Sequence, residues 1–122
     1  MRGERGSVSV VAAAVVALVM VLSLGAADLA RAISAVARAQ TAADAAALAA
    51  AQELAIPSGL DPTKAAFDYA VRNGAALVAC DCPRGALEAT VRVSVDVGPM
   101  LLLADDRAVA ATARAVVENA SA

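Results

Sequence analysis

The N-terminal part of the chain carries one long, uncharged apolar run. Residues 7–27, 21 in all, contain no charged side chain and are mostly Ala, Val and Leu. As a helix this segment would be about 31 Å long, close to the thickness of the hydrocarbon core of a bilayer. A soluble protein of this size could not bury a helix that is apolar on every side. The pattern therefore predicts a membrane-spanning segment.

Such a segment is compatible with three fates. It can stay as an anchor, with residues 8–27 in the membrane. It can be a secretory signal, because the small residues at 25–27 form a plausible signal-peptidase site. It can also be a pilin-type leader cut between Gly6 and Ser7. The run exceeds the roughly 7–15 apolar residues of an ordinary signal peptide, which favours retention.

The basic residues that precede the run indicate its orientation. Arg2, Arg5 and the free amine lie before it, and positive charge tends to stay in the cytoplasm. Arginines also follow the run, so the bias is modest. We expect residues 1–27 to form a cytoplasmic leader with a transmembrane segment. Residues 28–122 should then form an extracytoplasmic domain.

Beyond the apolar run the pattern stays helical but becomes amphipathic. No proline occurs before Pro57, and alanine, the best helix former, dominates. We therefore predict one nearly continuous helix over residues 8–55, about 70 Å long, half in lipid and half in water. The apolar stripe expected on its outer half is Leu29, Ile33, Val36, Ala43, Ala47, Ala51 and Leu54. The charged residues placed mainly off this stripe are Asp28, Arg31, Arg38, Asp44 and Glu53.

A second, shorter helix is predicted after the Pro- and Gly-containing break at residues 56–60. Asp61 is a suitable N-cap, Pro62 suits the first helical position, and Gly74 ends the helix. The expected helix covers residues 62–73. Its expected apolar side is Ala66, Phe67, Ala70 and Val71, with Phe67 in the core.

The remainder of the chain changes to strand periodicity. After a short apolar run at 76–80, residues 86–97 alternate strictly between apolar and polar side chains, which predicts a half-buried strand. Residues 108–118 alternate more weakly, and helix is a rival there because alanine dominates. The fold expected is α+β: a long N-terminal helix, a short second helix and a small antiparallel sheet whose apolar face covers the outer half of the long helix.

Two apolar features are candidate contact surfaces. Residues 98–106 join the last two strands and include Met100, Leu101, Leu102 and Leu103. Exposed apolar clusters often mark contact sites, so this loop is expected either to touch a membrane or a partner or to fold back onto the core. In the apolar run, the small residues Ser9, Ala13 and Ala17 recur every four positions and could seat another helix.

Composition argues against catalysis and nucleic-acid binding. Net charge is −2 with no basic cluster, whereas phosphate binding needs grouped Lys and Arg. There is no His, which removes the commonest general base and metal ligand. We therefore expect a non-enzymatic protein without cofactor, metal or small-molecule substrate. Asp105 and Asp106 are read as a solvated turn rather than a metal site.

Cys80 and Cys82 are the only cysteines. On a regular strand their Cα atoms would lie roughly 6.5 Å apart, so a disulfide between them would need a distorted backbone. A bond between the two, a bond to another chain and no specific role all remain open. A redox role is disfavoured, because Asp81 between them would raise a thiol pKa.

In combination these features resemble the TadE/TadG-like group of pilus-assembly, pilin-like proteins, most closely its short actinobacterial type. The resemblance is carried by residues 5–10, by the Ala-rich run at 38–51 and by Asn73-Gly74-Ala75-Ala76-Leu77 with Cys80 and the Val-rich strand after it. It implies a minor pilin-like component of a tight-adherence pilus or related secretion system. The implied partners are the membrane, other pilin-like subunits and the platform proteins.

The chain departs from the family pattern in two places. Processed pilins usually carry Glu five residues after the cleavage glycine, and that position is Val11 here. The resemblance also implies a cysteine near the start of the second helix, able to pair with the one after Asn-Gly-Ala, but residues 63–65 are Thr-Lys-Ala. Our interpretation is a single-pass assembly protein. The rival is a soluble envelope-binding protein released by signal peptidase, with a chain beginning near Asp28.

Overall fold

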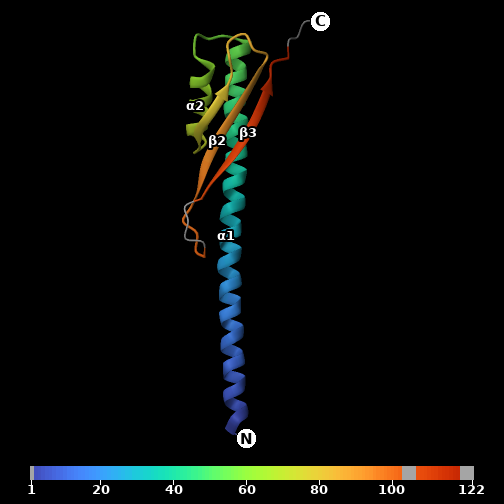
Figure 1. The fold of residues 1–122 in the computed structure, drawn as a ribbon, viewed down its shortest axis with the longest axis vertical. Coiled ribbons are helices and arrows are strands. Elements are labelled where there is room, and N and C mark those ends of the chain that lie inside the picture. Colours follow the sequence, from blue (N-terminus) through green and yellow to red (C-terminus); the bar gives the residue numbers. More distant parts are fainter. Residues whose placement is uncertain (1, 103–106, 119–122) are drawn as a thin grey trace.

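The computed structural model describes residues 2–102 and 107–118, and it confirms the predicted α+β fold (Figure 1). A long helix precedes a short helix and a three-stranded sheet. The elements are α1 (Arg2–Ala55), α2 (Pro62–Arg72), β1 (Ala76–Asp81), β2 (Glu88–Gly98) and β3 (Arg107–Val116).

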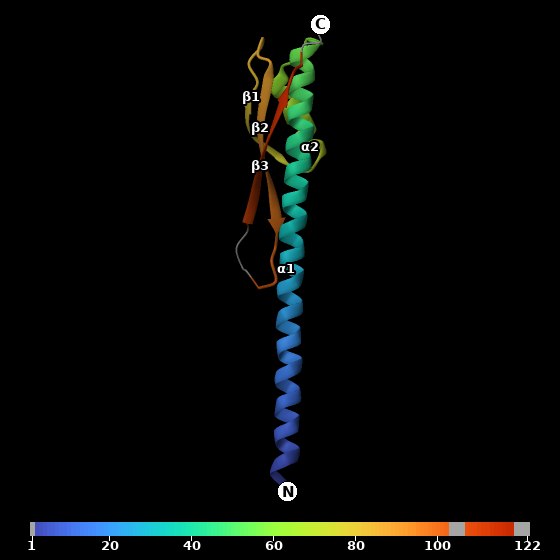
Figure 2. The same cartoon turned by 90° about the vertical axis from the view of Figure 1, so that its right-hand side faces the viewer.

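Helix α1 determines the shape of the molecule. Its 54 residues correspond to about 81 Å at 1.5 Å per residue. The second helix and the sheet pack along its C-terminal half, and most of the N-terminal half projects beyond them (Figures 1 and 2). The helix begins at Arg2, earlier than the predicted residue 8, and it ends at the predicted Ala55.

Helix α2 has the caps that its sequence predicts. Asp61 is the N-cap, and its carboxylate accepts a hydrogen bond from the Thr63 backbone N–H at 3.2 Å. Pro62 occupies the start of the helix, where no intrahelical donor is needed. Gly74 follows the C-cap residue with φ of +73°, a conformation that glycine adopts without steric cost.

The sheet is an antiparallel meander in the order β1-β2-β3. Helix was a rival for residues 108–118, but residues 107–116 form strand β3 and pair with β2 along its length, with Val93 opposite Ala111. Pairing with β2 decides between strand and helix here, because the alternating apolar positions of β3 then share the covered face of the sheet.

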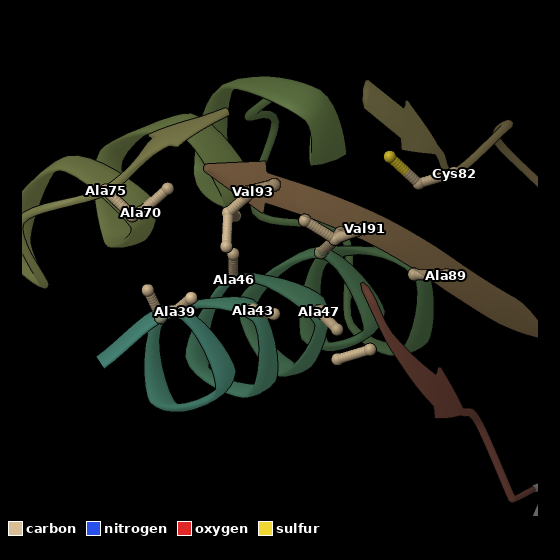
Figure 3. Packing of buried hydrophobic residues seen from close by; sticks show 14 of the residues in the cluster. Ala39, Ala43, Ala46, Ala47, Ala70, Ala75, Cys82, Ala89, Val91 and Val93 are labelled. Atoms are coloured by element: carbon tan, nitrogen blue, oxygen red, sulfur yellow. The ribbon is translucent and has the colours of Figure 1, made fainter. Parts of the chain in front are cut away.

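The core is built mainly from alanine. One face of α1 packs against α2 and the sheet through buried alanines such as Ala39, Ala43 and Ala46 (Figure 3). Val91 and Val93 of β2 are the largest fully buried side chains among the described residues. Because alanine is small, the elements approach closely and little space remains for larger side chains.

Two predictions about the core are wrong. Leu29, Ile33 and Val36 were placed on the buried stripe of the long helix, but they are 61%, 61% and 55% exposed. Instead, the buried face of this stretch includes Asp28 and Ala35. The sheet selects the alanine side of the helix because close packing requires small side chains there.

Phe67 also lies outside the core. Its side chain is 50% exposed, whereas its neighbours Ala65 and Ala66 and the later Ala70 of α2 are buried. The buried side of α2 is therefore rotated relative to the one predicted. Val71, expected beside Phe67, is 53% exposed for the same reason.

Candidate assembly and membrane interface

Residues 6–24 of α1 form an apolar rod in which every residue is exposed. Residues 6–55 contain an 18-residue window of mean hydropathy 2.7, and none of that window is buried. Val8 is 70% and Leu22 is 64% exposed. A helix with this length and composition can cross a membrane, which is one way to remove so much apolar surface from water.

The residues proposed for cleavage and helix packing lie on this rod. Gly6, Ser7, Ser9, Ala13 and Ala17 are all exposed within the helix. A methyl group added at Gly6 would meet no other part of the protein. This surface is therefore free for a partner, and the roles predicted for these residues stay predictions.

A buried carboxylate fastens the β2–β3 connection to α1 where the apolar segment ends. Asp28 is only 6% exposed. Its Oδ1 accepts a hydrogen bond from the Leu101 backbone N–H at 2.7 Å, and its Oδ2 accepts one from the Leu102 N–H at 2.8 Å. Hydrogen bonds to an ionised acceptor are stronger than neutral ones. Asp28 thus satisfies two adjacent backbone donors of a segment more than 70 residues away in sequence.

Arg31 strengthens the same attachment. Its guanidinium donates a hydrogen bond to the Pro99 carbonyl oxygen at 3.0 Å and lies 3.9 Å from the Asp28 carboxylate. The side chain is 45% exposed, so its ion pair with Asp28 is partly screened by solvent. We refer to Asp28 and Arg31, with the backbone of residues 99–102 that they hold, as the clamp.

The residue pattern did not predict the clamp. In that pattern Asp28 is one of the charged residues that lie mainly off the apolar stripe. The partners here are backbone N–H groups, which no side-chain pattern records. The only available signal was position, because Asp28 is the first charged residue after the apolar run.

We call residues 99–102, which follow β2 and are held by the clamp, the tip. The tip carries exposed apolar side chains. Leu101 is 52% and Leu102 is 49% exposed, and Met100 is half-buried. The loop therefore folds back onto α1 through its backbone while two leucines stay accessible. Leu103, also predicted as part of this surface, and the acidic pair at 105–106 lie outside the described residues.

A groove of about 630 Å³ lies between α1 and the ends of β2 and β3, next to the tip. Its walls are mainly apolar, and the charged side chains at its edge are Asp28 and Arg107. The residues that line it are Gly25, Asp28, Leu29, Ala32, Val97, Met100, Leu102, Arg107, Ala108 and Val109. The groove thus opens beside the end of the apolar segment.

The exposed apolar surface of the rod continues along α1 into the part of the helix that packs against the sheet and α2. Leu29, Ile33 and Val36 lie at helical spacing on an exposed side of α1, and Leu29 also lines the groove. They extend the apolar surface of the N-terminal half by about 10 Å at 1.5 Å per residue. We call these three residues the outer strip.

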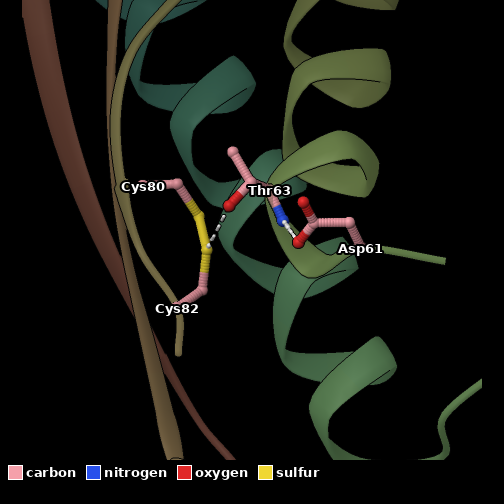
Figure 4. Close-up of a disulfide and its surroundings, with 4 residues drawn as sticks. All are labelled: Asp61, Thr63, Cys80 and Cys82. Atoms are coloured by element: carbon pink, nitrogen blue, oxygen red, sulfur yellow. Dashed lines mark hydrogen bonds between the residues drawn. A yellow bond between two sulfur atoms is a disulfide. The ribbon is translucent and has the colours of Figure 1, made fainter. Parts of the chain in front are cut away.

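The two cysteines form a disulfide in the structure (Figure 4). Their Cα atoms are 5.6 Å apart, shorter than the spacing on a regular strand, because Cys82 lies beyond the end of β1 where the chain begins to turn. The Thr63 hydroxyl at the start of α2 is 3.6 Å from the Cys82 sulfur. The second helix therefore contacts the disulfide at the position where the family resemblance implied a cysteine.

The C-terminal end of α1 has its own polar contact. The Glu53 carboxylate accepts hydrogen bonds from the Ser58 hydroxyl at 2.7 Å and from the Ser58 backbone N–H at 3.1 Å. These hydrogen bonds, helped by the charge of Arg84, lower the pKa of Glu53 from its ordinary value of 4.5. The contact fixes the turn after the helix and has no catalytic geometry.

Among the described residues, no group of three or more His, Cys, Asp or Glu side chains could hold a metal ion. The prominent features of this part of the chain are therefore surfaces: the apolar rod, the clamped tip and the outer strip.

Comparison with known proteins identifies the N-terminal helix. Residues 6–53 match the model of the Tad family, described as "Putative Flp pilus-assembly TadE/G-like". No curated protein and no solved structure matches the chain. The matched residues cover nearly all of α1, including the apolar rod and the helical residues of the clamp. Over residues 6–53 the chain is thus similar to the TadE/G-like family, as the resemblance predicted.

Proposed function

We propose that the protein is a minor pilin-like assembly component of a tight-adherence, Flp-type pilus or a related secretion system. It acts by packing its helix against other subunits and performs no catalysis. The observation that carries the proposal is the uncovered apolar surface of α1, which runs from the rod onto the outer strip. Its partners are the membrane, other pilin-like subunits and the proteins of the secretion platform.

In this proposal residues 8–27 anchor the chain in the cell membrane. The N-terminus is cytoplasmic, as the preceding arginines favour, and residues 28–122 form an extracytoplasmic pilin-like domain. The Cys80–Cys82 disulfide would be stable in that oxidising compartment. Small residues on the rod allow close approach of a neighbouring helix.

The structure also provides a reason to favour retention over release. Cleavage after Ala27 would leave Asp28 as the first residue of the mature chain. Helix ends fray, because their first N–H groups have no intrahelical acceptor. The carboxylate that holds the backbone of Leu101 and Leu102 would then sit on a frayed end. An intact α1 keeps it on a continuous helix.

The N-terminus of the mature protein tests the anchor. Mass spectrometry of membrane and medium fractions should find the chain in the membrane, beginning at Met1 for a fixed anchor or at Ser7 for pilin-type processing. A soluble chain beginning near Asp28 would refute the anchored assembly component and establish the secreted binding protein instead.

The outer strip provides the test of assembly. We expect Ile33→Asp to reduce the share of the protein in detergent-solubilised high-mass complexes by roughly tenfold or more, because it places an unpaired charge in a buried contact. Val78→Asp is the matched control, since Val78 is 57% exposed on β1, away from the strip. Equal recovery of both variants in the complexes would refute packing through the outer strip.

A further inference from the structure

Along the axis of α1, the tip lies beside the C-terminal end of the apolar segment. Asp28 directly follows that segment, and its carboxylate holds the backbone N–H groups of Leu101 and Leu102. Side chains on a helix lean toward its N-terminus, which here is the direction of the anchor. Both views show the described chain that follows β2 running down beside α1 toward its N-terminal half (Figures 1 and 2).

The Leu102 side chain extends closer to the N-terminus of α1 than Asp28 does. A methyl group added to Gly25 would lie 3.7 Å from Leu102 Cδ1, so this side chain lies against the helix within the apolar segment. Gly25 is about 4.5 Å closer to the N-terminus than Asp28 along the helix axis. The tip therefore overlaps the end of the segment that anchors the chain.

The polarity of the side chains at the tip changes along the axis of α1, as polarity changes across the interface of a bilayer. At the bottom are the half-exposed side chains of Leu101 and Leu102. Above them, Arg31 is partly exposed and Arg107 lies at the edge of the groove. Among the described residues near this level, Asp28 is buried and held by backbone donors and Arg31, whereas Asp96 is exposed and lines a hollow together with Arg31. Apolar groups at the acyl boundary, with cations at the height of the phosphates, are typical of proteins that enter an interface.

From this geometry we infer that the β2–β3 tip is a second membrane contact, in which Leu101 and Leu102 insert into the outer headgroup layer beside α1. The occupant of this apolar surface is the lipid of the bilayer that α1 already crosses, because the surface is continuous with the anchor. The inference rests on the anchor of the proposed function. The anchor and the tip beside it are two attachment points, and together they restrict the tilt and rotation of the domain and thereby fix the direction in which the outer strip faces.

The absence of tryptophan from the chain makes a direct test possible. Single-tryptophan variants of the full chain are reconstituted in phosphatidylcholine vesicles containing lipids brominated either close to the headgroup or deep in the acyl chain. Leu101→Trp reports on the tip. Leu18→Trp, at a 59% exposed position of the rod, reports on the anchor. Ile56→Trp, 81% exposed just after α1, is the control for the distant end of the domain.

We expect Leu101→Trp to emit at a shorter wavelength than Ile56→Trp and to lose most of its fluorescence to the shallow bromines. Leu18→Trp should be quenched more by the deep bromines, and Ile56→Trp by neither. If Leu18→Trp is quenched while Leu101→Trp is quenched only by aqueous acrylamide, the tip contact is refuted and the anchor stands. If neither is quenched by bromine, the anchor itself is refuted, and the tip contact with it.

Contact with protein gives a different pattern. A short emission wavelength for Leu101→Trp without bromine quenching would mean that another copy or a partner covers the tip. That outcome would overturn the lipid contact.

Discussion

The clamp allows a quantitative prediction, because the Asp28 carboxylate accepts two of its hydrogen bonds. Replacing Asp28 with alanine removes both hydrogen-bond acceptors from the Leu101 and Leu102 N–H groups. It also removes the ion-pair partner of Arg31. The hydrogen bonds of α1 itself are not affected, since alanine is a good helix former.

The magnitude follows from the two hydrogen bonds. A hydrogen bond to a charged group contributes about 1.5–3 kcal/mol, and the lower value applies here because the opened tip can hydrogen-bond to water. Two such bonds give about 3 kcal/mol for opening of the tip, which corresponds to a roughly 100-fold increase in the open population. Asp28→Asn keeps one acceptor and loses the charge, so its effect should lie between those of wild type and Asp28→Ala.

Hydrogen exchange of the Leu101 and Leu102 amides in detergent micelles measures this opening. We expect exchange in Asp28→Ala to be about 100-fold faster than in wild type, with amides of the β2–β3 ladder little changed. Asp44→Ala is the matched control. It removes an acidic side chain from the same helix, but one whose carboxylate accepts only from Gln40 at an exposed position. Wild-type exchange rates at both leucines in Asp28→Ala would refute the clamp.

Two further predictions concern the core and the end of α1. Ala46, fully buried and opposite Val93 (Figure 3), should tolerate leucine poorly, and we expect Ala46→Leu to lower the free energy of unfolding by about 1–3 kcal/mol. Thermal unfolding followed by circular dichroism measures it, and Leu48→Ala, 56% exposed on the same helix, should change it by less than about 0.5 kcal/mol. Equal effects of the two would contradict close packing through alanine. The pKa of Glu53 is lowered in the folded state, so its contribution to stability is present above its ordinary value of 4.5 and is lost as pH falls through the lower folded value. The NMR chemical shift of the Ser58 amide proton should change with a midpoint below pH 4.5, and Glu53→Gln should abolish this titration. A midpoint at or above pH 4.5 would contradict the lowered pKa of Glu53.

The sequence was most informative where a pattern depends on neighbours in the chain. The continuous helix, the Asp61 cap with the Gly74 stop and the alternating strand that became β2 all follow from local backbone and side-chain preferences. The apolar rod was equally predictable, because length and hydropathy determine whether a helix can cross a bilayer.

The local sequence pattern did not predict which face of an element is buried where several of its faces are apolar. On the outer half of α1, large apolar side chains and alanines occupy different sides, and hydropathy favours the larger ones. The sheet instead packs on the alanines, which leaves Leu29, Ile33 and Val36 exposed. Phe67 was misplaced for the same reason, because its ring does not fit between closely packed helices.

The sequence by itself therefore determined both helices, strand β2 and the order of the elements, since helix and strand preferences and the length of the apolar run are local properties. Only the tertiary structure decided which face of α1 is buried, how Cys82 meets Cys80, and where Asp28 finds its partners. Each of these depends on contacts between segments far apart in the chain. The backbone donors of Leu101 and Leu102 come within reach of Asp28 only after β2 and β3 have paired alongside α1.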